Sequence, residues 1–450
     1  MNFAKSYLPK SGIDLDLKSS AGRRVWNAQT FCTDTQQLEA TFNAIAHTIE
    51  LLRQPENETL FIRLDHKLYE IQDITGTLYN LQMRQVLGDI ELFEVKNFAL
   101  VAEQIRALTT GLNLTTLPDL NAAIDVLDPA HDRIATFYIY DTYDPELPAL
   151  RKQMQACDEV PAELFDRISA IEDRVRNRLS QQLEPHVQAM STTLNAIAAL
   201  DILIAKAQQA IALKLCRPIL ATNEHTIYKA LFNPPVQAAL KANGKTYQPV
   251  DIAFENVPTL ITGLNMGGKT VLLRTLALAQ YMCQFGMFVP AQSATIALVD
   301  NIMICIDDEQ NSLQGLSSFA MEMQRVNEIL LATERPQRLL VLIDELARTT
   351  NPTEGRAIVD AMLQMLTERR VRAFITTHYD HISTPCRHLR VRGLLSNASD
   401  MNIHNIDRYI DYSLVEETAR NVPHEALRIA AILGVNDELI ARAEKMLKQQ

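Results

Sequence analysis

The stretch from residue 263 to residue 270 constrains the fold of this chain more than any other part of the sequence. It reads Gly263-Leu-Asn-Met-Gly-Gly-Lys-Thr270 and fits the pattern G-x-x-x-x-G-K-[ST] without a mismatch. The apolar segment 258–262 precedes it, and the segment 271–280, which has no proline or glycine, follows it. This order predicts a buried strand, a tight loop and a helix, the framework of a phosphate-binding loop.

In such a loop, backbone N–H groups and the N-terminus of the following helix surround the phosphates of a nucleotide. Lys269 is expected to reach the β- and γ-phosphates, and the Thr270 hydroxyl is expected to bind Mg²⁺. The other loop residues expected to contact the nucleotide are Gly263, Asn265, Met266, Gly267 and Gly268. A glycine-rich turn without function is the alternative, and the strand–loop–helix context disfavours it. We therefore predict that the chain binds ATP and Mg²⁺.

A second apolar run, residues 338–343, ends in two acids, Asp344 and Glu345. Such a run is typical of a central parallel strand that carries carboxylates at its C-terminal edge. We predict that Asp344 holds the Mg²⁺ and that Glu345 is the general base for the attacking water. A third apolar run, 371–377, ends at His378, whose imidazole is expected to sense the γ-phosphate. The three strand ends would converge on one nucleotide.

Four motifs of the chain together resemble those of the MutS family of ATPases. Residues 262–270 are similar to T-G-P-N-M-G-G-K-S, 317–323 to S-T-F-x-x-E-M, 344–350 to D-E-I-G-R-G-T and 376–379 to A-T-H-Y. The resemblance covers about residues 225–385 and implies an ABC-type ATPase in which two subunits form composite sites. By this resemblance Ser317 contacts the γ-phosphate held by the opposite subunit. Taken alone, the serine is also a good N-cap for an amphipathic helix, and both interpretations hold together.

The sequence departs from these motifs at several positions. Leu264 replaces the proline of the phosphate-binding loop, and Ala347 and Thr349 replace the two glycines of G-R-G-T. These changes leave the residues expected to contact phosphate and metal in place. They alter the loop that the resemblance places against the partner subunit. We therefore expect hydrolysis to survive and the coupling between subunits to differ.

The N-terminal half shows the periodicity of packed helices. One apolar stripe contains Leu38, Phe42, Ile45, Ile49 and Leu52, and a longer one contains Leu164, Ile168, Ile171, Val175, Leu179, Leu183, Val187, Met190, Leu194 and Ile197. Pro185 is expected to kink or restart the longer helix. Residues 18–24 and the segment opening at Asp201 are similar to parts of the MutS core. These stripes predict a helical core and lever.

Parts of the MutS pattern are expected to be missing. Residues 144–151 resemble the start of the family's DNA clamp, yet the sequence continues directly into the helical stretch 163–215. The resemblance to the core begins at about residue 10, so no mismatch-recognition module is expected before it. A C-terminal helix is expected at 426–447. The resemblance therefore implies a shortened form of the family.

Charge argues against tight binding to DNA. The formal net charge is −11, and residues 51–150 carry 7 basic and 16 acidic side chains. DNA-binding proteins normally cluster Lys and Arg, because phosphate neutralisation supplies most of the affinity. Only two basic segments stand out, 369–372 and 387–392. Six scattered cysteines without a C-x-x-C pair, and the lack of a membrane-spanning or signal-like run, predict a cytoplasmic protein.

We therefore predict a multidomain protein with an all-α core and lever at 1–220, an α/β ABC-type P-loop ATPase at 221–400 and C-terminal dimerisation helices at 401–450. It would act as a homodimer, or as a heterodimer with a similar subunit, and use ATP to move its lever arms. The arms would hold DNA, as in a repair or recombination homologue with weak or no mismatch specificity. The alternative is that the arms hold a protein client. In that case the chain would resemble the short MutS-like ATPases that reactivate cobalamin-dependent aminomutases. A third hypothesis is an interaction module that does not hydrolyse ATP, and the complete set of predicted site residues argues against it.

Overall fold

The computed structural model describes the chain except residues 1–13, 157–158, 160, 264–267, 307–317, 380–381, 396–405, 418–424 and 448–450. It consists of two compact units. The helical unit contains Leu15–Thr30 and Asn43–Ile211. The α/β unit contains Phe31–Phe42 and the described residues from Ala212 onward. The domain boundaries expected from the sequence stay a prediction.

Apart from the first part of α3, the N-terminal half of the described chain forms the helical unit, and it contains no strand. Its helices are α2 Ser20–Ala28, α3 Thr35–Leu52, α4 Glu58–Glu70, α5 Thr75–Gln82, α6 Asp89–Thr109, α7 Asn121–Leu127, α8 Leu147–Gln155, α9 Ala162–Leu183 and α10 Val187–Ala212. Short 3₁₀ turns lie at η1 Pro55–Asn57, η2 Asp141–Tyr143 and η3 Glu184–His186. This architecture agrees with the helical core expected from the apolar stripes.

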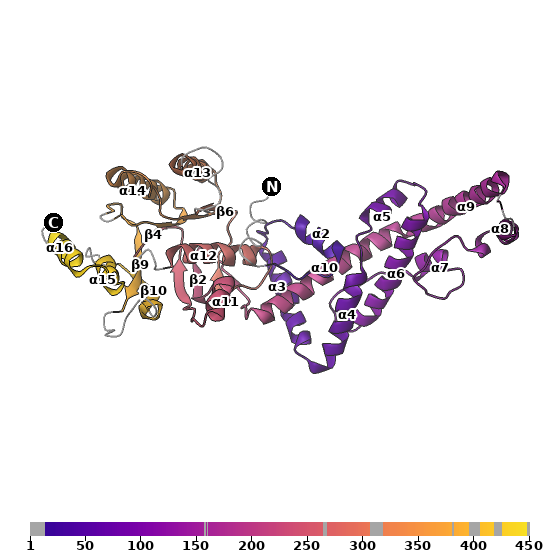
Figure 1. The fold of residues 1–450 in the computed structure, drawn as a ribbon, viewed down its shortest axis with the longest axis horizontal. Coiled ribbons are helices and arrows are strands. Elements are labelled where there is room, and N and C mark those ends of the chain that lie inside the picture. The colour runs from indigo at the N-terminus through magenta and orange to yellow at the C-terminus, as the bar shows by residue number, and fades with distance from the viewer. Residues whose placement is uncertain are drawn as a thin grey trace. The chain divides into compact units, whose positions relative to one another are not determined.

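The longest feature of the helical unit is the succession of α9, η3 and α10, in which α9 continues the line of α10 (Figure 1). Pro185 lies in η3, so the expected interruption of the helix is confirmed. The longer apolar stripe is buried except at Val187, which is half-buried. Residues 162–212 are the one stretch of the described chain long and apolar enough to cross a membrane, but 56% of the most apolar window is buried. We interpret the stretch as a core helix.

One buried carboxylate joins the beginning of the helical unit to α10. Asp201 is 1% exposed and accepts hydrogen bonds from the Ser19 N–H at 2.8 Å and the Ser19 hydroxyl at 2.6 Å. The Ser19 hydroxyl also accepts the Gly22 N–H at 2.8 Å and so caps α2. A β-carbon at Gly22 would lie 2.3 Å from Asp201 Oδ2, so only glycine fits there. The two sequence segments that resemble the MutS core therefore meet.

The α/β unit is built on two sheets. The strands are β1 Ile219–Leu220, β2 Thr226–Leu231, β3 Val250–Phe254, β4 Pro258–Thr262, β5 Ser293–Ile296, β6 Asn301–Cys305, β7 Leu339–Ile343, β8 Arg372–Thr376, β9 Arg387–Leu394 and β10 Ile410–Glu416. The smaller sheet has the order β1-β5-β2-β3, and the larger has the order β10-β9-β4-β8-β7-β6. Within the larger sheet only β10 runs antiparallel to its neighbour.

Helices cover both faces of the larger sheet. They are α12 Lys269–Gln284, α13 Ser318–Thr333 and α14 Pro352–Glu368, and a further helix, α11 Pro234–Ala242, follows β2. Alternate residues of β7, beginning with Leu339, pack in one cluster with side chains of α13 and α14. The residues between them face the side of α12, and all of β7 is buried. This two-sided burial explains the uninterrupted apolar run that precedes Asp344.

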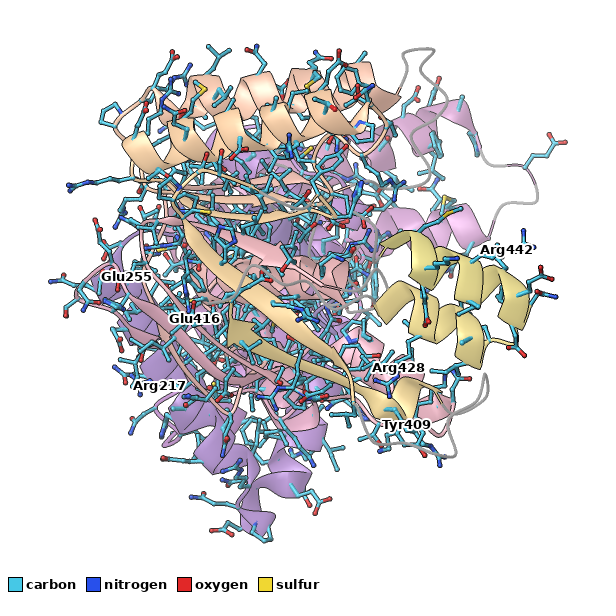
Figure 2. All side chains as sticks on the ribbon, turned by 90° about the vertical axis from the view of Figure 1, so that its left-hand side faces the viewer. Arg217, Glu255, Tyr409, Glu416, Arg428 and Arg442 are labelled. Atoms are coloured by element: carbon cyan, nitrogen blue, oxygen red, sulfur yellow. The ribbon has the colours of Figure 1, made fainter. Side chains whose placement is uncertain are left out.

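The C-terminal region differs from the single helix expected at 426–447. Two helices are present, α15 Glu425–Ile432 and α16 Asp437–Leu447, and Figure 2 shows them side by side with Arg428 and Arg442 labelled. Gly434 has a φ of 78°, a left-handed conformation that ends α15. The segment 401–450 is also not helical throughout, because it supplies η5 Ile406–Tyr409 and β10. The residues of β10 are extended and pair with β9, so this part of the segment is a strand and not a helix.

Candidate active site

The carboxyl ends of three neighbouring strands meet at one carboxylate. Asp344 follows β7, Thr376 ends β8, and Thr270 lies in the first turn of α12, after β4. The Thr270 hydroxyl donates to Asp344 Oδ2 at 2.6 Å, and the Thr376 hydroxyl donates to Asp344 Oδ1 at 2.5 Å. The predicted convergence of β4, β7 and β8 is therefore present, because these strands are adjacent and parallel in the sheet.

Lys269 is the first residue of α12 and follows the predicted phosphate-binding loop. Its side chain donates to the Gly263 carbonyl at 2.7 Å, and the residue is only 3% exposed. Burial lowers the pKa of Lys269, and the nearby carboxylates of Glu345 and Asp344 oppose this effect. Gly263 and Gly268 have φ values of 120° and 73°, conformations that favour glycine. The described ends of the loop therefore have the backbone that the motif requires.

Several predicted contact residues lie outside the described part of the chain. These residues are Asn265, Met266, Gly267 and Ser317. Their proposed contacts with nucleotide, including the contact of Ser317 with a partner's γ-phosphate, stay predictions. The helix expected directly after Ser317 is α13, which begins at Ser318.

Glu345 lies next to Asp344 in a conformation unusual for its residue type. Its φ is 47°, in the left-handed region, and its N–H donates to the Thr376 hydroxyl at 2.8 Å. Its carboxylate forms an ion pair with Arg348 at 2.7 Å. Ala347 has a φ of 61° and occupies the place of the first glycine in D-E-I-G-R-G-T. The loop therefore keeps a glycine-like conformation without the glycine, which carries an energetic cost.

Contacts from two other elements hold this strained loop. The Ala347 N–H donates to Glu322 of α13 at 2.7 Å, and the Tyr379 hydroxyl donates to the Ala347 carbonyl at 2.6 Å. Gly355 of α14 leaves room for Tyr379, since a β-carbon there would lie 2.2 Å from the tyrosine oxygen. The motifs alone do not predict these contacts of Glu322 and Tyr379, or a role for Thr376. The sequence does contain a clue to the role of Thr376, because the apolar run that forms β8 ends in polar residues.

His378 lies two residues beyond the end of β8 and is exposed. Its ring is 4.4 Å from that of Tyr379, measured between centroids. The structure therefore places it after the same strand that supplies Thr376. Its role as a sensor of the γ-phosphate stays a prediction.

The polar groups around Asp344 fit Mg²⁺. This ion prefers oxygen ligands and is usually held by one or two carboxylates together with waters and substrate phosphates. Asp344 and Thr270 supply a carboxylate and a hydroxyl oxygen within 2.6 Å of each other. Within the described residues no group of three or more His, Cys, Asp and Glu side chains could form an all-protein metal site. The donor set therefore suits a metal shared with phosphate.

Several arginines of the two basic segments of the sequence are paired with acids or buried. Arg387 pairs with Glu416, labelled in Figure 2, through a 2.9 Å hydrogen bond from its Nε. Arg392 pairs with Asp411 at 3.3 Å, and Arg372 is only 3% exposed. Much of their positive charge is neutralised or buried within the α/β unit. Pairing and burial of these three arginines reduce the positive charge that they can offer to a phosphate backbone.

Comparison with known proteins finds a family model and relatives that agree with one another. The family model for MutS domain V matches residues 259–450. Endonuclease MutS2 of Thermus thermophilus is 35% identical over 282 residues, which make up 62% of this chain and 35% of that protein. The DNA mismatch repair protein MutS of Bacteroides fragilis is 29% identical over 291 residues, 63% of this chain and 33% of that protein. The chain spans about a third of the length of these relatives.

All four motifs that carry the sequence resemblance lie within the region matched by the family model. The described parts of the first, third and fourth motifs meet around Asp344, and the second supplies Glu322, which contacts the loop after Glu345. Motif order, matched region and identity to both relatives agree. Together these findings support a MutS-family protein, and over residues 259–450 the chain matches MutS domain V.

Proposed function

We propose that this protein is a Mg²⁺-dependent ATPase. The observation that carries the proposal is the Asp344 carboxylate, held between the hydroxyls of Thr270 and Thr376 beside the phosphate-binding loop. Bound Mg²⁺ would neutralise charge that develops on the transferred phosphoryl group. The test is ATP hydrolysis by the purified chain, which should require Mg²⁺ and stop when EDTA removes it.

The side chains divide the work of hydrolysis. Lys269 would leave the Gly263 carbonyl to contact the β- and γ-phosphates, and Thr270 and Asp344 would hold the metal. Glu345 would accept a proton from the attacking water, which requires its carboxylate to leave Arg348. That ion pair is exposed on the arginine side, where the side chain is 60% accessible, so it is weak enough to open.

We further propose that two chains, as a homodimer or with a similar subunit, use this cycle to move helical lever arms. In support, Glu322 of the second MutS-like motif contacts the loop 345–350, and the same motif contains Ser317. The helical unit, with the long α9–α10 succession, would provide the arms. The setting we propose is the cytoplasm, in a repair- or recombination-related role.

A nucleotide-dependent dimer is the expected consequence. Glu345→Gln is expected to bind ATP without turnover, so two chains should remain closed on the trapped nucleotide. Sedimentation velocity should show a shift toward dimer on addition of ATP and Mg²⁺, and no shift with Lys269→Ala. A chain that stays monomeric with ATP at high concentration would contradict the composite site.

DNA binding is expected to be weak and independent of mismatches. The chain has a net charge of −11, and its two basic segments are largely paired or buried. Any residual binding should fall steeply between about 50 and about 200 mM salt, as counterion release requires. Fluorescence anisotropy with matched and mismatched duplexes measures this directly.

The same experiment separates the two candidate roles. Tight binding to DNA at physiological salt that distinguishes the mismatched from the matched duplex would favour a role in repair. Absence of binding to either duplex would favour the second candidate, an ATP-dependent remodelling factor for a protein client such as a cobalamin-dependent aminomutase. The observation that favours this second role is the acidic balance of residues 51–150, with 16 acidic and 7 basic side chains.

A further inference from the structure

One buried hydroxyl contacts the carboxylate of Asp344 and the backbone N–H of Glu345 in the proposed ATPase site. Thr376 is fully buried at the end of β8, in register with Ile261 of β4. Its O–H donates to Asp344 Oδ1 at 2.5 Å, and its oxygen accepts the N–H of Glu345 at 2.8 Å. A threonine hydroxyl offers one donor and two acceptor sites, so this arrangement uses the donor and one acceptor.

The first of these bonds orients the carboxylate of Asp344. With Oδ1 held by Thr376, the second oxygen, Oδ2, faces Thr270 at 2.6 Å. The carboxylate is thus fixed from both sides by hydroxyls of β8 and α12. A partner that orients a metal-binding carboxylate in this way also tunes its affinity for the metal.

The second bond fixes the start of the strained loop. Glu345 has a φ of 47°, and its N–H is held by Thr376 where the chain enters this left-handed conformation. Ala347, with a φ of 61°, lacks the freedom of the glycine found in D-E-I-G-R-G-T. The A-T-H-Y motif that residues 376–379 resemble carries alanine where this chain has Thr376. The Thr376 hydroxyl therefore holds the backbone where the strained loop begins.

We infer that Thr376 is a positioning residue that sets the metal-holding carboxylate and the backbone of the general base through one hydroxyl. The inference deepens the proposed function and rests on the roles given there to Asp344 and Glu345. It predicts that metal dependence and turnover change together when the hydroxyl is removed. A residue that only filled space in the sheet would change neither.

The test compares Thr376→Val with Thr376→Ser. Valine keeps the shape and removes the hydroxyl, so kcat should fall by roughly tenfold or more, a loss of about 1.4 kcal/mol in barrier stabilisation. The Mg²⁺ concentration for half-maximal rate should rise by roughly tenfold, as for other lost partners of metal ligands. ATP binding without Mg²⁺ should stay unchanged. Thr376→Ser keeps the hydroxyl and should restore both kcat and Mg²⁺ dependence to near wild type.

A matched control exists on the adjacent strand. Thr259 of β4 is also fully buried, but its hydroxyl has no hydrogen-bond partner among the described residues. Thr259→Val should therefore leave kcat and Mg²⁺ dependence unchanged. Thermal unfolding of each variant reports on folding. If Thr376→Val prevents folding, the pair Thr376→Ala and Thr376→Ser supplies the same comparison with less bulk beside Asp344.

The outcomes of these experiments distinguish a failure of the positioning role from a failure of the proposed ATPase function. Wild-type hydrolysis by Asp344→Asn or Glu345→Gln would refute the assigned roles, whatever Thr376 does. If those variants are inactive but Thr376→Val keeps wild-type kcat and Mg²⁺ dependence, the positioning role is wrong. Equal losses in Thr376→Val and Thr376→Ser would also overturn it, since the hydroxyl would then not be the cause.

Discussion

Glu345→Gln is expected to slow ATP hydrolysis by about a hundredfold or more, because an amide cannot accept the proton of the attacking water. ATP binding should survive, since Lys269 and Thr270 remain in place. The side chain is nearly isosteric, and it keeps an oxygen that can accept a hydrogen bond from Arg348, its 2.7 Å partner. Single-turnover hydrolysis, measured together with equilibrium binding of ATP, tests both halves of the expectation.

A matched control is Glu368→Gln. Glu368 is an exposed acid at the C-terminal end of α14, where it accepts a hydrogen bond from Gln364 at 3.0 Å. This variant should hydrolyse ATP at the wild-type rate. If Glu345→Gln does the same, the general base is a different group.

Lys269→Ala is expected to abolish measurable ATP binding and hydrolysis. The ammonium is the principal fixed charge available to the β- and γ-phosphates, and it is already buried at the loop, 2.7 Å from the Gly263 carbonyl. Its removal leaves only backbone N–H groups and hydroxyls to meet the phosphate charge. Isothermal titration with ATP and Mg²⁺ should detect no heat of specific binding.

Lys229→Ala is the control for the loss of a lysine in the same unit. Lys229 lies on β2, where it is exposed and paired with Asp251 at 3.0 Å. Its removal should leave ATP affinity unchanged. Retained affinity in Lys269→Ala would show that the loop does not hold the nucleotide through this side chain.

The sequence was sufficient to predict β4, the helix after it and β7, because local order and uninterrupted burial leave one interpretation. The same reasoning placed Thr270 and Asp344 at a common site. It failed at 426–447, where apolar spacing continued across Gly434 and concealed the break between α15 and α16. Gly434 is itself a local signal for the end of a helix, and its left-handed φ shows that this signal outweighs the apolar periodicity.

The contacts of Thr376, Glu322 and Tyr379 could not be predicted in the same way. Each joins residues that lie 25 to 32 positions apart in the chain, and their geometry depends on how β7, β8 and α13 pack. A motif fixes which residue types occur, but not which atom of a carboxylate meets which hydroxyl. Such contacts follow only once the tertiary structure is known.

In the proposed function the α9–η3–α10 succession would act as a lever as well as a core. Its 51 residues would extend over roughly 75 Å at 1.5 Å per residue. A rotation of about 5° at one end of a rod of this length displaces the other by about 6 Å, which exceeds one helical turn. The 3₁₀ turn at Pro185 interrupts the regular helix hydrogen bonding, so in such a lever we expect bending to concentrate there and to limit how much of a small rotation reaches the distal end.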